Sequence, residues 1–434
     1  MPPIELAFWC IGAVLVLIAM RMPIGIALGL VSFLGLTELR GINVAFGMLK
    51  SVPHDFLSHW ELSAVPMFLL MGAIAHNTGI SGALFNAARL WLSGLPGGLA
   101  VAANFASAGF AAASGSSVAT AAAMGRIAIP EMVRQGYDKS LATGTVASAG
   151  TIGALIPPSI AFVLYGTFAE VSITKLLIAG VFPGVLTAII YALMIIIRCK
   201  LKPELAPPVT ESATWVARMR ALLDVWPVLL LVLGIIGGLY AGVMTPTEAG
   251  GFGAFLAFII AFIQGRLSIQ SVKDSISESV SATARIFFVA IGAVLLTKFL
   301  ALTGLSGYLG AMVGSWALDP ILLILAASLV YLLLGMFLDP IGVLLLTLPI
   351  LLPMFEALNM DLVWVGVILV KYIEIGLLTP PVGFNVYVIK SVVGNDISLE
   401  TIFKGVFWFL MCEVAIMALL IGFPQISLYL PSQM

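Results

Sequence analysis

A polar, helix-breaking stretch set between apolar runs is the feature that most limits how this chain can fold. Residues 114–159 are rich in Gly, Ser, Thr and Pro, yet long apolar runs lie on both sides of them. In the hydrocarbon of a membrane, an unpaired backbone N–H or C=O group costs several kcal/mol. A segment that breaks its helices at membrane depth must therefore lie inside protein or line a cavity, where ions or polar solutes are handled.

A second stretch matches the first at an offset of 223 residues. The pairs Pro157-Pro158 and Pro380-Pro381 each lie nineteen positions after an aspartate, Asp138 or Asp361. At the same offset Pro23 matches Pro246, Ser116 matches Asp339, Pro130 matches Pro353, and Gly153 matches Gly376. With a two-residue shift in register, TGISG at 78–82 also matches TGLSG at 303–307. So many Pro and Gly matches predict an internal repeat, and repeats interrupted at matching places are typical of secondary transporters.

Composition places both copies in a membrane. The 434 residues are 61% hydrophobic and 9% charged, whereas soluble domains are about 45–50% apolar and about 25% charged. The chain is therefore predicted to be an all-α polytopic membrane protein. No basic patch with interleaved aromatic residues indicates nucleic-acid binding, and Cys10, Cys199 and Cys412 have no metal or redox spacing. The start lacks a basic region before its apolar run, which predicts a first span rather than a removable signal.

Ten apolar runs are predicted to cross the roughly 30 Å hydrocarbon core. They cover residues 4–20, 23–37, 62–76, 140–168, 176–197, 222–240, 245–263, 281–300, 362–390 and 402–423. Two further segments, 97–130 and 317–356, are broken in the middle and are predicted to be re-entrant hairpins. The spans 140–168 and 362–390 carry breaks of their own, at TVASAGTIGALIPP and EIGLLTPP, where Gly and Pro would unwind the helix.

The repeat also divides the chain. Residues 1–198 are predicted to form the first copy, 199–221 a hydrophilic cytoplasmic linker, and 222–434 the second copy. Segments 41–60, 81–95 and 267–280 mix polar and apolar residues and are predicted to be amphipathic helices along the membrane interface.

Positive charges orient the spans, because cytoplasmic loops carry an excess of Lys and Arg. Placing the linker in the cytoplasm puts fifteen Lys and Arg residues on that side and four on the other. Both termini are then periplasmic, the two copies have inverted topology, the first hairpin enters from the cytoplasm and the second from the periplasm.

The hairpin tips and the breaks opposite them are predicted to bind one cation per copy. Helix ends at a break present N–H or C=O groups, and hydroxyl and carbonyl oxygens without a fixed charge suit Na⁺. The candidate ion ligands are Ser114, Gly115, Ser116, Ser117, Gly150 and Thr151 in the first copy, and Leu338, Asp339, Pro340, Gly376 and Thr379 in the second. An organic substrate between the two ions is expected to contact Ser117, Thr120, Pro157, Pro158, Ser159, Pro380, Pro381 and Asn385.

Several of these residues have structural alternatives. Ser and Gly in membrane helices also allow close helix packing, and Asp339 can simply cap the helix that follows it. Lys371 and Glu374, three positions apart, are predicted to neutralise each other, with a proton relay as the alternative. Glu248 is predicted to stabilise a helix start, while Glu413 in the last span has no explanation from the sequence.

Nothing in the chain indicates an enzyme. No histidine lies near the central serines in sequence, which argues against a Ser–His nucleophile at Ser116 or Ser117. No Walker-type phosphate-binding loop is present either, so the chain is not expected to hydrolyse ATP.

Four motifs closely resemble the large membrane subunit of tripartite ATP-independent periplasmic (TRAP) transporters. They are SGSSVATAAAMGRIAIPEMVRQGYDKSLATGTVASAGTIGALIPPSI from residue 114, MTPTEAG from 244, GMFLDPIGVLLLTLPILLP from 335 and LLTPPVGFNVYVIK from 377. The resemblance covers essentially the whole chain. It implies Na⁺-driven uptake of an organic acid across a bacterial inner membrane.

The resemblance also implies partners and a mechanism. The partners are a soluble periplasmic substrate-binding protein and a small four-helix membrane subunit, the latter expected as a separate chain because this one starts directly with the large subunit. The implied mechanism is an elevator, in which residues 97–168 and 317–390 move against a scaffold. C4-dicarboxylates, sialic acid and sugar acids all remain possible substrates. The alternatives are a stand-alone inverted-repeat anion or Na⁺ transporter, an intramembrane enzyme and a passive channel.

Overall fold

The computed structural model describes residues 2–79, 81–207, 214–315 and 319–434, and every regular element in these ranges is helical. Ile80 of the TGISG motif, residues 208–213 of the predicted linker and residues 317 and 318 of the second predicted hairpin lie outside the described residues. The helices up to the linker are α1 (Pro3–Ala19), α2 (Ile24–Arg40), α3 (Ile42–Leu57), η1 (Trp60–Ser63), α4 (Ala64–Asn77), α5 (Ser81–Leu92), α6 (Gly98–Ser114), α7 (Ser117–Arg134), α8 (Lys139–Gly150), η2 (Thr151–Ala154), α9 (Ile160–Phe168), α10 (Ile173–Ala179) and α11 (Val181–Leu201).

The remaining helices run from the linker to the end of the chain. They are η3 (Pro203–Leu205), α12 (Trp215–Leu223), α13 (Trp226–Tyr240), α14 (Pro246–Ile263), α15 (Ile269–Thr303), α16 (Leu305–Ser315), α17 (Pro320–Gly335), α18 (Pro340–Ala357), α19 (Leu362–Gly376), α20 (Phe384–Val393), α21 (Leu399–Gly422), α22 (Gln425–Leu428) and η4 (Pro431–Gln433). The prediction of an all-helical fold is confirmed.

Five helices in the described part are long and apolar enough to cross a membrane, or up to seven if two bent pairs each form one span. Several predicted spans fall outside this group because their helices are short or interrupted. The predicted breaks are present: residues 140–168 divide into α8, η2 and α9, and residues 362–390 divide into α19 and α20. The structure is therefore a multi-span helical bundle with broken helices at the predicted positions.

The prediction of a separate interfacial helix at 267–280 is wrong. Residues 269–303 form one continuous helix of 35 residues, α15, which starts at a Ser268 capping box. The sequence has no Pro in this range and no Gly before Gly292, so nothing interrupts the backbone hydrogen bonds. The other two amphipathic segments do form separate helices, α3 and α5, and the helix pair η1–α4 turns 62° away from α3.

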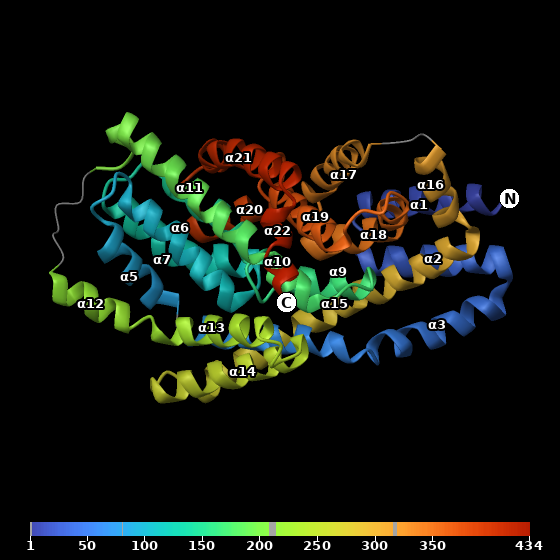
Figure 1. Cartoon of the computed structure of the whole chain (residues 1–434), viewed down its shortest axis with the longest axis horizontal. Helices are drawn as coiled ribbons and strands as arrows, with labels where there is room; N and C mark the ends of the chain where they lie inside the picture. Colours follow the sequence, from blue (N-terminus) through green and yellow to red (C-terminus); the bar gives the residue numbers. More distant parts are fainter. Residues whose placement is uncertain (1, 80, 208–213, 316–318) are drawn as a thin grey trace.

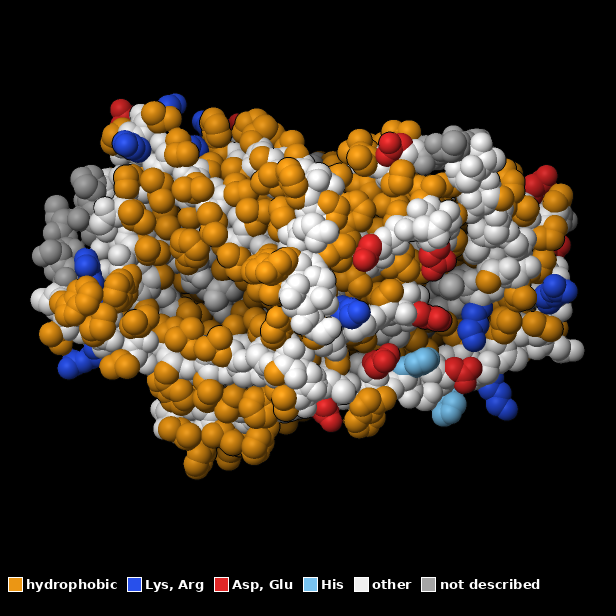
Figure 2. All heavy atoms as spheres, viewed as in Figure 1, with side chains coloured by type: hydrophobic (Ala, Val, Ile, Leu, Met, Phe, Trp, Pro, Cys, Tyr) orange, Lys and Arg blue, Asp and Glu red, His pale blue; other side chains and the backbone are white. Residues whose placement is uncertain are grey.

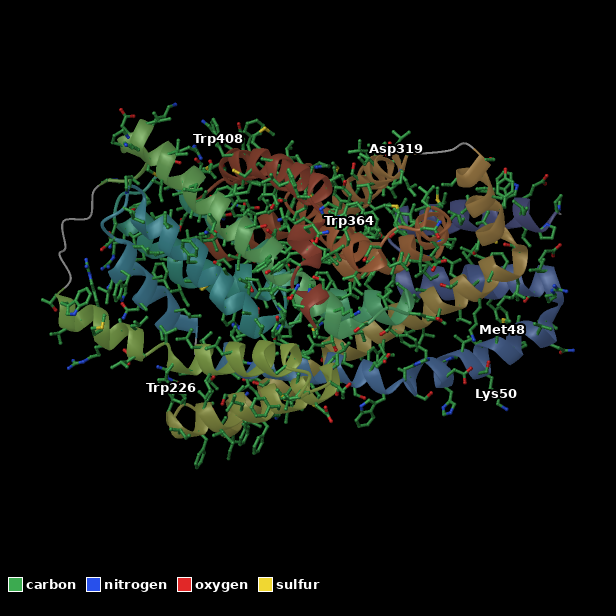
Figure 3. All side chains as sticks on the ribbon, viewed as in Figure 1. Met48, Lys50, Trp226, Asp319, Trp364 and Trp408 are labelled. Atoms are coloured by element: carbon green, nitrogen blue, oxygen red, sulfur yellow. The ribbon has the colours of Figure 1, made fainter. Side chains whose placement is uncertain are left out.

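The two helical hairpins flank α19 in the middle of the molecule (Figure 1). The first hairpin, α6 and α7, lies toward one end of the long axis, and the second, α17 and α18, lies toward the other. The indole N–H of Trp364, at the centre of Figure 3, donates to the carbonyl of Leu420 at 3.0 Å and ties α19 to α21. The hydroxyl of Tyr165 donates to the carbonyl of Leu362 at 2.8 Å and joins the two halves of the chain.

Apolar side chains cover much of the surface, most evidently over α13 and α14 (Figure 2). Large exposed residues on these two helices include Leu233, Phe255, Phe262 and Ile263. Contiguous apolar surface of this extent is unfavourable in water and is suited to lipid or to another membrane chain.

Candidate ion and substrate site

The first hairpin tip is a sharp reversal built on glycine. Gly115 ends α6 with φ +62°, and a Cβ there would lie 2.4 Å from the carbonyl oxygen of Pro158. Ser116 then caps α7, its hydroxyl oxygen accepting from the N–H of Ala119 at 3.3 Å. The hydroxyls of Ser114 and Thr120 face each other at 2.8 Å and are buried. The tip thus places backbone and hydroxyl oxygens together against the Pro157-Pro158 segment.

The break in the next helix packs directly against this tip. A Cβ on Gly150 would lie 3.0 Å from the carbonyl oxygen of Ser117, and a Cβ on Gly153 would lie 3.2 Å from the carbonyl carbon of Ser116. Thr151 is fully buried, and its hydroxyl donates to the carbonyl of Ser148 at 2.6 Å. A Cβ at either position would be closer than ordinary van der Waals contact, so glycine suits this close approach of the two backbones.

The second tip repeats this packing with different side chains. Gly335 ends α17, and a Cβ on Gly376 would lie 2.8 Å from its Cα atom. Asp339 caps α18, with one carboxylate oxygen accepting from the N–H of Gly342 at 3.0 Å. Asp339 therefore caps the helix that follows it, which is the structural alternative predicted from the sequence. Thr379 returns its hydroxyl to the carbonyl of Ile375 at 2.7 Å.

The two candidate clusters differ in exposure. Ser114, Ser117, Thr120, Thr151 and Ser159 are buried, as are Pro157 and Pro158. In the second copy Asp339, Pro380 and Pro381 are exposed, while Gly376 is buried. Ser159 caps α9 by accepting from the N–H of Phe162 at 3.3 Å, so one predicted substrate residue has a structural role in this state.

Asn385 connects the copies at the level of the breaks. It is fully buried, and its side-chain N–H donates to the carbonyl of Ala147 on α8 at 3.3 Å. Its amide oxygen has no hydrogen-bond partner among the described residues. A buried amide that is only half satisfied is available to an incoming polar group.

The predicted neutral pair of Lys371 with Glu374 is wrong. The ammonium of Lys371 instead forms an ion pair with Glu413, 2.7 Å between Nζ and Oε1, and also donates to the hydroxyl of Thr187 at 3.2 Å. The hydroxyl of Tyr191 donates to the same Glu413 oxygen. Tertiary packing brings α21 beside α19, so Glu413 is the counter-charge of Lys371. The signal for this pair in the sequence was a charged residue inside each of two apolar helices.

Glu248 has the predicted role at a helix start. The N–H of Glu248 donates to the hydroxyl of Thr245 at 3.3 Å, and the Glu248 carboxylate accepts from the N–H of Thr245 at 2.8 Å, which completes a capping box.

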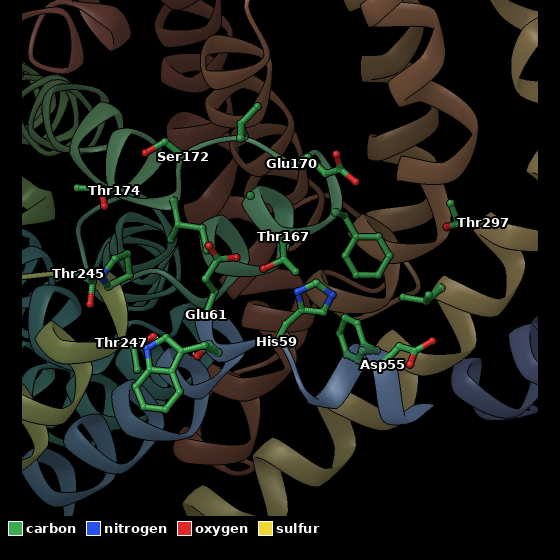
Figure 4. A pocket seen from close by; sticks show the side chains of 18 of the residues that line it. Asp55, His59, Glu61, Thr167, Glu170, Ser172, Thr174, Thr245, Thr247 and Thr297 are labelled. Carbon is green, nitrogen blue, oxygen red and sulfur yellow. Dashed lines mark hydrogen bonds between the residues drawn. The ribbon is translucent and has the colours of Figure 1, made fainter. Parts of the chain in front are cut away.

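A separate cavity of about 830 Å³ lies away from the tips, between η1, the α9–α10 connection and the start of α14 (Figure 4). Threonine hydroxyls and acidic side chains, including Asp55, Glu61 and Glu170, line it together with Lys298. None of the predicted ion or substrate residues lines it. Among the described residues no cluster of three or more His, Cys, Asp and Glu side chains is arranged to hold a metal ion.

A helical membrane bundle in which two hairpin tips meet two broken helices is the architecture of a secondary transporter. The described fold is similar to the crystal structure of the Alcanivorax borkumensis YdaH transporter, with a TM-score of 0.66, 14% identity and 91% of each chain covered.

Residues 11–426 match the family "Tripartite ATP-independent periplasmic transporter, DctM component", and the chain belongs to this family. The C4-dicarboxylate TRAP transporter large permease protein DctM of Pseudomonas aeruginosa is 37% identical, covering 86% of this chain and 87% of that protein. The sialic acid TRAP transporter large permease protein SiaM of Vibrio cholerae is 32% identical over 94% and 95% of the two chains. The chain is therefore a TRAP large permease and not an enzyme.

Proposed function

We propose that this permease uses the inward movement of Na⁺ to import an organic acid bearing a carboxylate. The observation that carries the proposal is the contact between the first tip and the break facing it, where Gly150 and Gly153 pack on the backbone of Ser116 and Ser117. This contact gathers hydroxyl and carbonyl oxygens, the ligands that a hard monovalent cation prefers. The similar proteins named for C4-dicarboxylate and sialic acid support an organic acid as the substrate.

We assign one Na⁺ site to each hairpin tip and the substrate site to the region between the tips. One Na⁺ would lie among Ser114–Ser117, Gly150 and Thr151, and a second among Leu338–Pro340, Gly376 and Thr379. The substrate would lie between them, where Asn385 holds an amide oxygen without a partner among the described residues. Pro157, Pro158, Pro380 and Pro381 would line its path, with Ser117, Thr120 and Ser159 supplying hydroxyls.

The topology in this proposal consists of ten spans in two inverted copies, 1–198 and 222–434, joined by a cytoplasmic linker. The two hairpins would enter from opposite sides of the inner membrane, and both termini would be periplasmic. Residues 97–168 and 317–390 would move as one elevator domain against the remaining helices. The repeat at an offset of 223 residues and the uneven distribution of Lys and Arg support this arrangement.

A tripartite system implies two further components beside this one. We propose that they are a periplasmic substrate-binding protein and a small four-helix membrane subunit. We propose that the small subunit packs on the exposed apolar surface over α13 and α14, the rest of which faces lipid.

The test is uptake into proteoliposomes that contain this chain, its small subunit and its binding protein, with a panel of labelled organic acids. We expect uptake only with an inward Na⁺ gradient and only with the binding protein. Uptake without the binding protein would favour a stand-alone transporter, and uptake without Na⁺ would overturn the coupling.

Two variants test the first ion site in the same assay. Ser117→Ala removes a hydroxyl ligand, and Gly150→Leu forces a side chain into the carbonyl of Ser117. Each is expected to lower uptake roughly tenfold or more. Losing the buried hydroxyl contact of Ser117 costs about 1–3 kcal/mol, and overpacking the tight contact at Gly150 costs about 1–3 kcal/mol. The matched controls are Ser58→Ala, an exposed hydroxyl, and Gly237→Leu, where a Cβ meets nothing within 4 Å. Normal uptake by both site variants would refute the assignment.

A further inference from the structure

Three ionisable side chains, one basic and two acidic, are buried together beside the first tip. Lys371, Glu374 and Glu413 are each at most 2% exposed. The ammonium of Lys371 is held by Glu413 and Thr187 at 2.7 and 3.2 Å, and the same Glu413 oxygen accepts from Tyr191. In their ionised forms, one cation and two carboxylates leave one net negative charge, and Glu374 is the carboxylate outside the close ion pair.

One carboxylate oxygen of Glu374 lacks a partner. Its Oε2 atom has no hydrogen bond among the described residues. The Ser117 hydroxyl faces its carboxylate, while the charges of Lys371 and Glu413 act on it from outside hydrogen-bonding distance. A buried charge without its own counter-charge costs several kcal/mol, and inside a membrane protein such a residue marks an ion or substrate site.

The position of Glu374 ties it to the first tip. It lies on α19, in the second copy, yet it faces Ser117, the first residue of α7. That residue is also the one whose carbonyl packs on Gly150. A cation bound among the oxygens of this tip would lie next to the open carboxylate oxygen.

Glu374 has no acidic counterpart at the equivalent position of the first copy. At the offset of 223 residues the counterpart of Glu374 is Thr151, which is neutral. The two copies therefore supply different electrostatics at equivalent positions.

We propose that Glu374 supplies the fixed negative charge of the first Na⁺ site, across the boundary between the two copies, and that the bound ion is its counter-charge. The inference rests on the proposed Na⁺ coupling and deepens it. It makes the first site a high-affinity site with a buried carboxylate, and the second a weaker site because its carboxylate, Asp339, is exposed and screened by solvent.

The experiment measures ²²Na⁺ binding to the purified chain in detergent, with choline as the replacing cation and neither substrate nor partner proteins present. We expect Glu374→Gln to weaken the tighter binding roughly tenfold or more, because the Coulomb attraction of a close carboxylate is lost. Glu374→Asp keeps the charge, so its affinity for Na⁺ should lie between those of the unmodified chain and Glu374→Gln. The matched control Glu38→Gln removes an exposed carboxylate and should bind as the unmodified chain does.

Tight binding by a folded Glu374→Gln variant within twofold of the unmodified chain would overturn this inference and leave Na⁺ coupling intact. No Na⁺ binding by the unmodified chain would overturn the proposed coupling and this inference with it.

A second measurement on the unmodified chain guards against a variant that fails to fold. A carbodiimide that labels carboxyl groups in apolar surroundings is applied with Na⁺ or with choline, and labelled peptides are identified by mass spectrometry. Na⁺ should protect Glu374 and leave the labelling of Glu413 unchanged. Equal labelling of Glu374 in both salts would contradict the proposal.

Discussion

At the scale of single residues, the buried pair of Lys371 and Glu413 shows how charges are tolerated inside this bundle. The two groups meet at 2.7 Å, and hydroxyls from Thr187 and Tyr191 add hydrogen bonds, while Glu413 Oε2 has no partner among the described residues. Replacing both members of such a pair is often nearly neutral, whereas removing one leaves an unpaired buried charge.

Lys371→Met is therefore expected to destabilise the protein by roughly 3–5 kcal/mol. The double variant Lys371→Met with Glu413→Gln should recover most of that loss, because Gln still accepts from Tyr191 without carrying a charge. Thermal unfolding of the purified chain in detergent measures both. Equal destabilisation by the single and double variants would show that the charge of Glu413 is not what Lys371 compensates.

At the scale of elements, the two copies start their broken helices in the same way. Asp138 accepts from the N–H groups of Ser140 and Leu141 at 3.0 Å. Asp361, at the equivalent position, accepts from Val363 and Trp364 at 2.9 and 3.1 Å. Burial raises the pKa of Asp138, but the hydrogen bonds from Ser140 and Leu141 outweigh it and lower the pKa below the ordinary aspartate value.

Asp138→Ala and Asp361→Ala should each destabilise the protein by about 0.5–2 kcal/mol, since each removes an N-cap. Because the folded pKa of Asp138 is lowered, its contribution is full above the ordinary aspartate pKa and is lost as the pH falls through the lowered value. Thermal unfolding at neutral and acidic pH tests this, with the exposed Glu38→Ala as control. If Asp138→Ala lowered the stability equally at neutral and acidic pH, the ionised Asp138 carboxylate would not be acting as the N-cap.

At the scale of the whole molecule, the elevator proposal divides the helices into a moving set and a fixed set. His76 on α4 and Phe110 on α6 meet across that boundary with ring centroids 6.4 Å apart. Asn77 on α4 and Ser275 on α15 meet within the fixed set, 3.1 Å between the amide nitrogen and the hydroxyl.

Cysteines at positions 76 and 110, in a chain lacking Cys10, Cys199 and Cys412, should stop uptake when joined by a reducible cross-linker. Uptake should return on reduction, because the link holds the moving set against α4. The same link between positions 77 and 275 should leave uptake unchanged. Full uptake by a completely cross-linked 76–110 variant would refute movement at this boundary.

From the sequence alone one can predict the helical class, the breaks near Ser114–Ser117, Gly150 and Gly376, and the repeat. These follow from local chemistry, because Gly and Pro interrupt helices and apolar runs of span length demand a membrane. The sequence also identifies the family through its motifs.

Only the tertiary structure decided which distant groups meet. It paired Lys371 with Glu413 instead of Glu374, placed Glu374 against Ser117 of the other copy, and brought Asn385 to the carbonyl of Ala147. Residues three apart on one helix looked like natural partners, but the packing of α19 against α21 and the Ser117 hydroxyl at the first tip offered each charge a different neighbour. Such choices depend on how helices distant in the chain pack together, and no local pattern in the sequence records that.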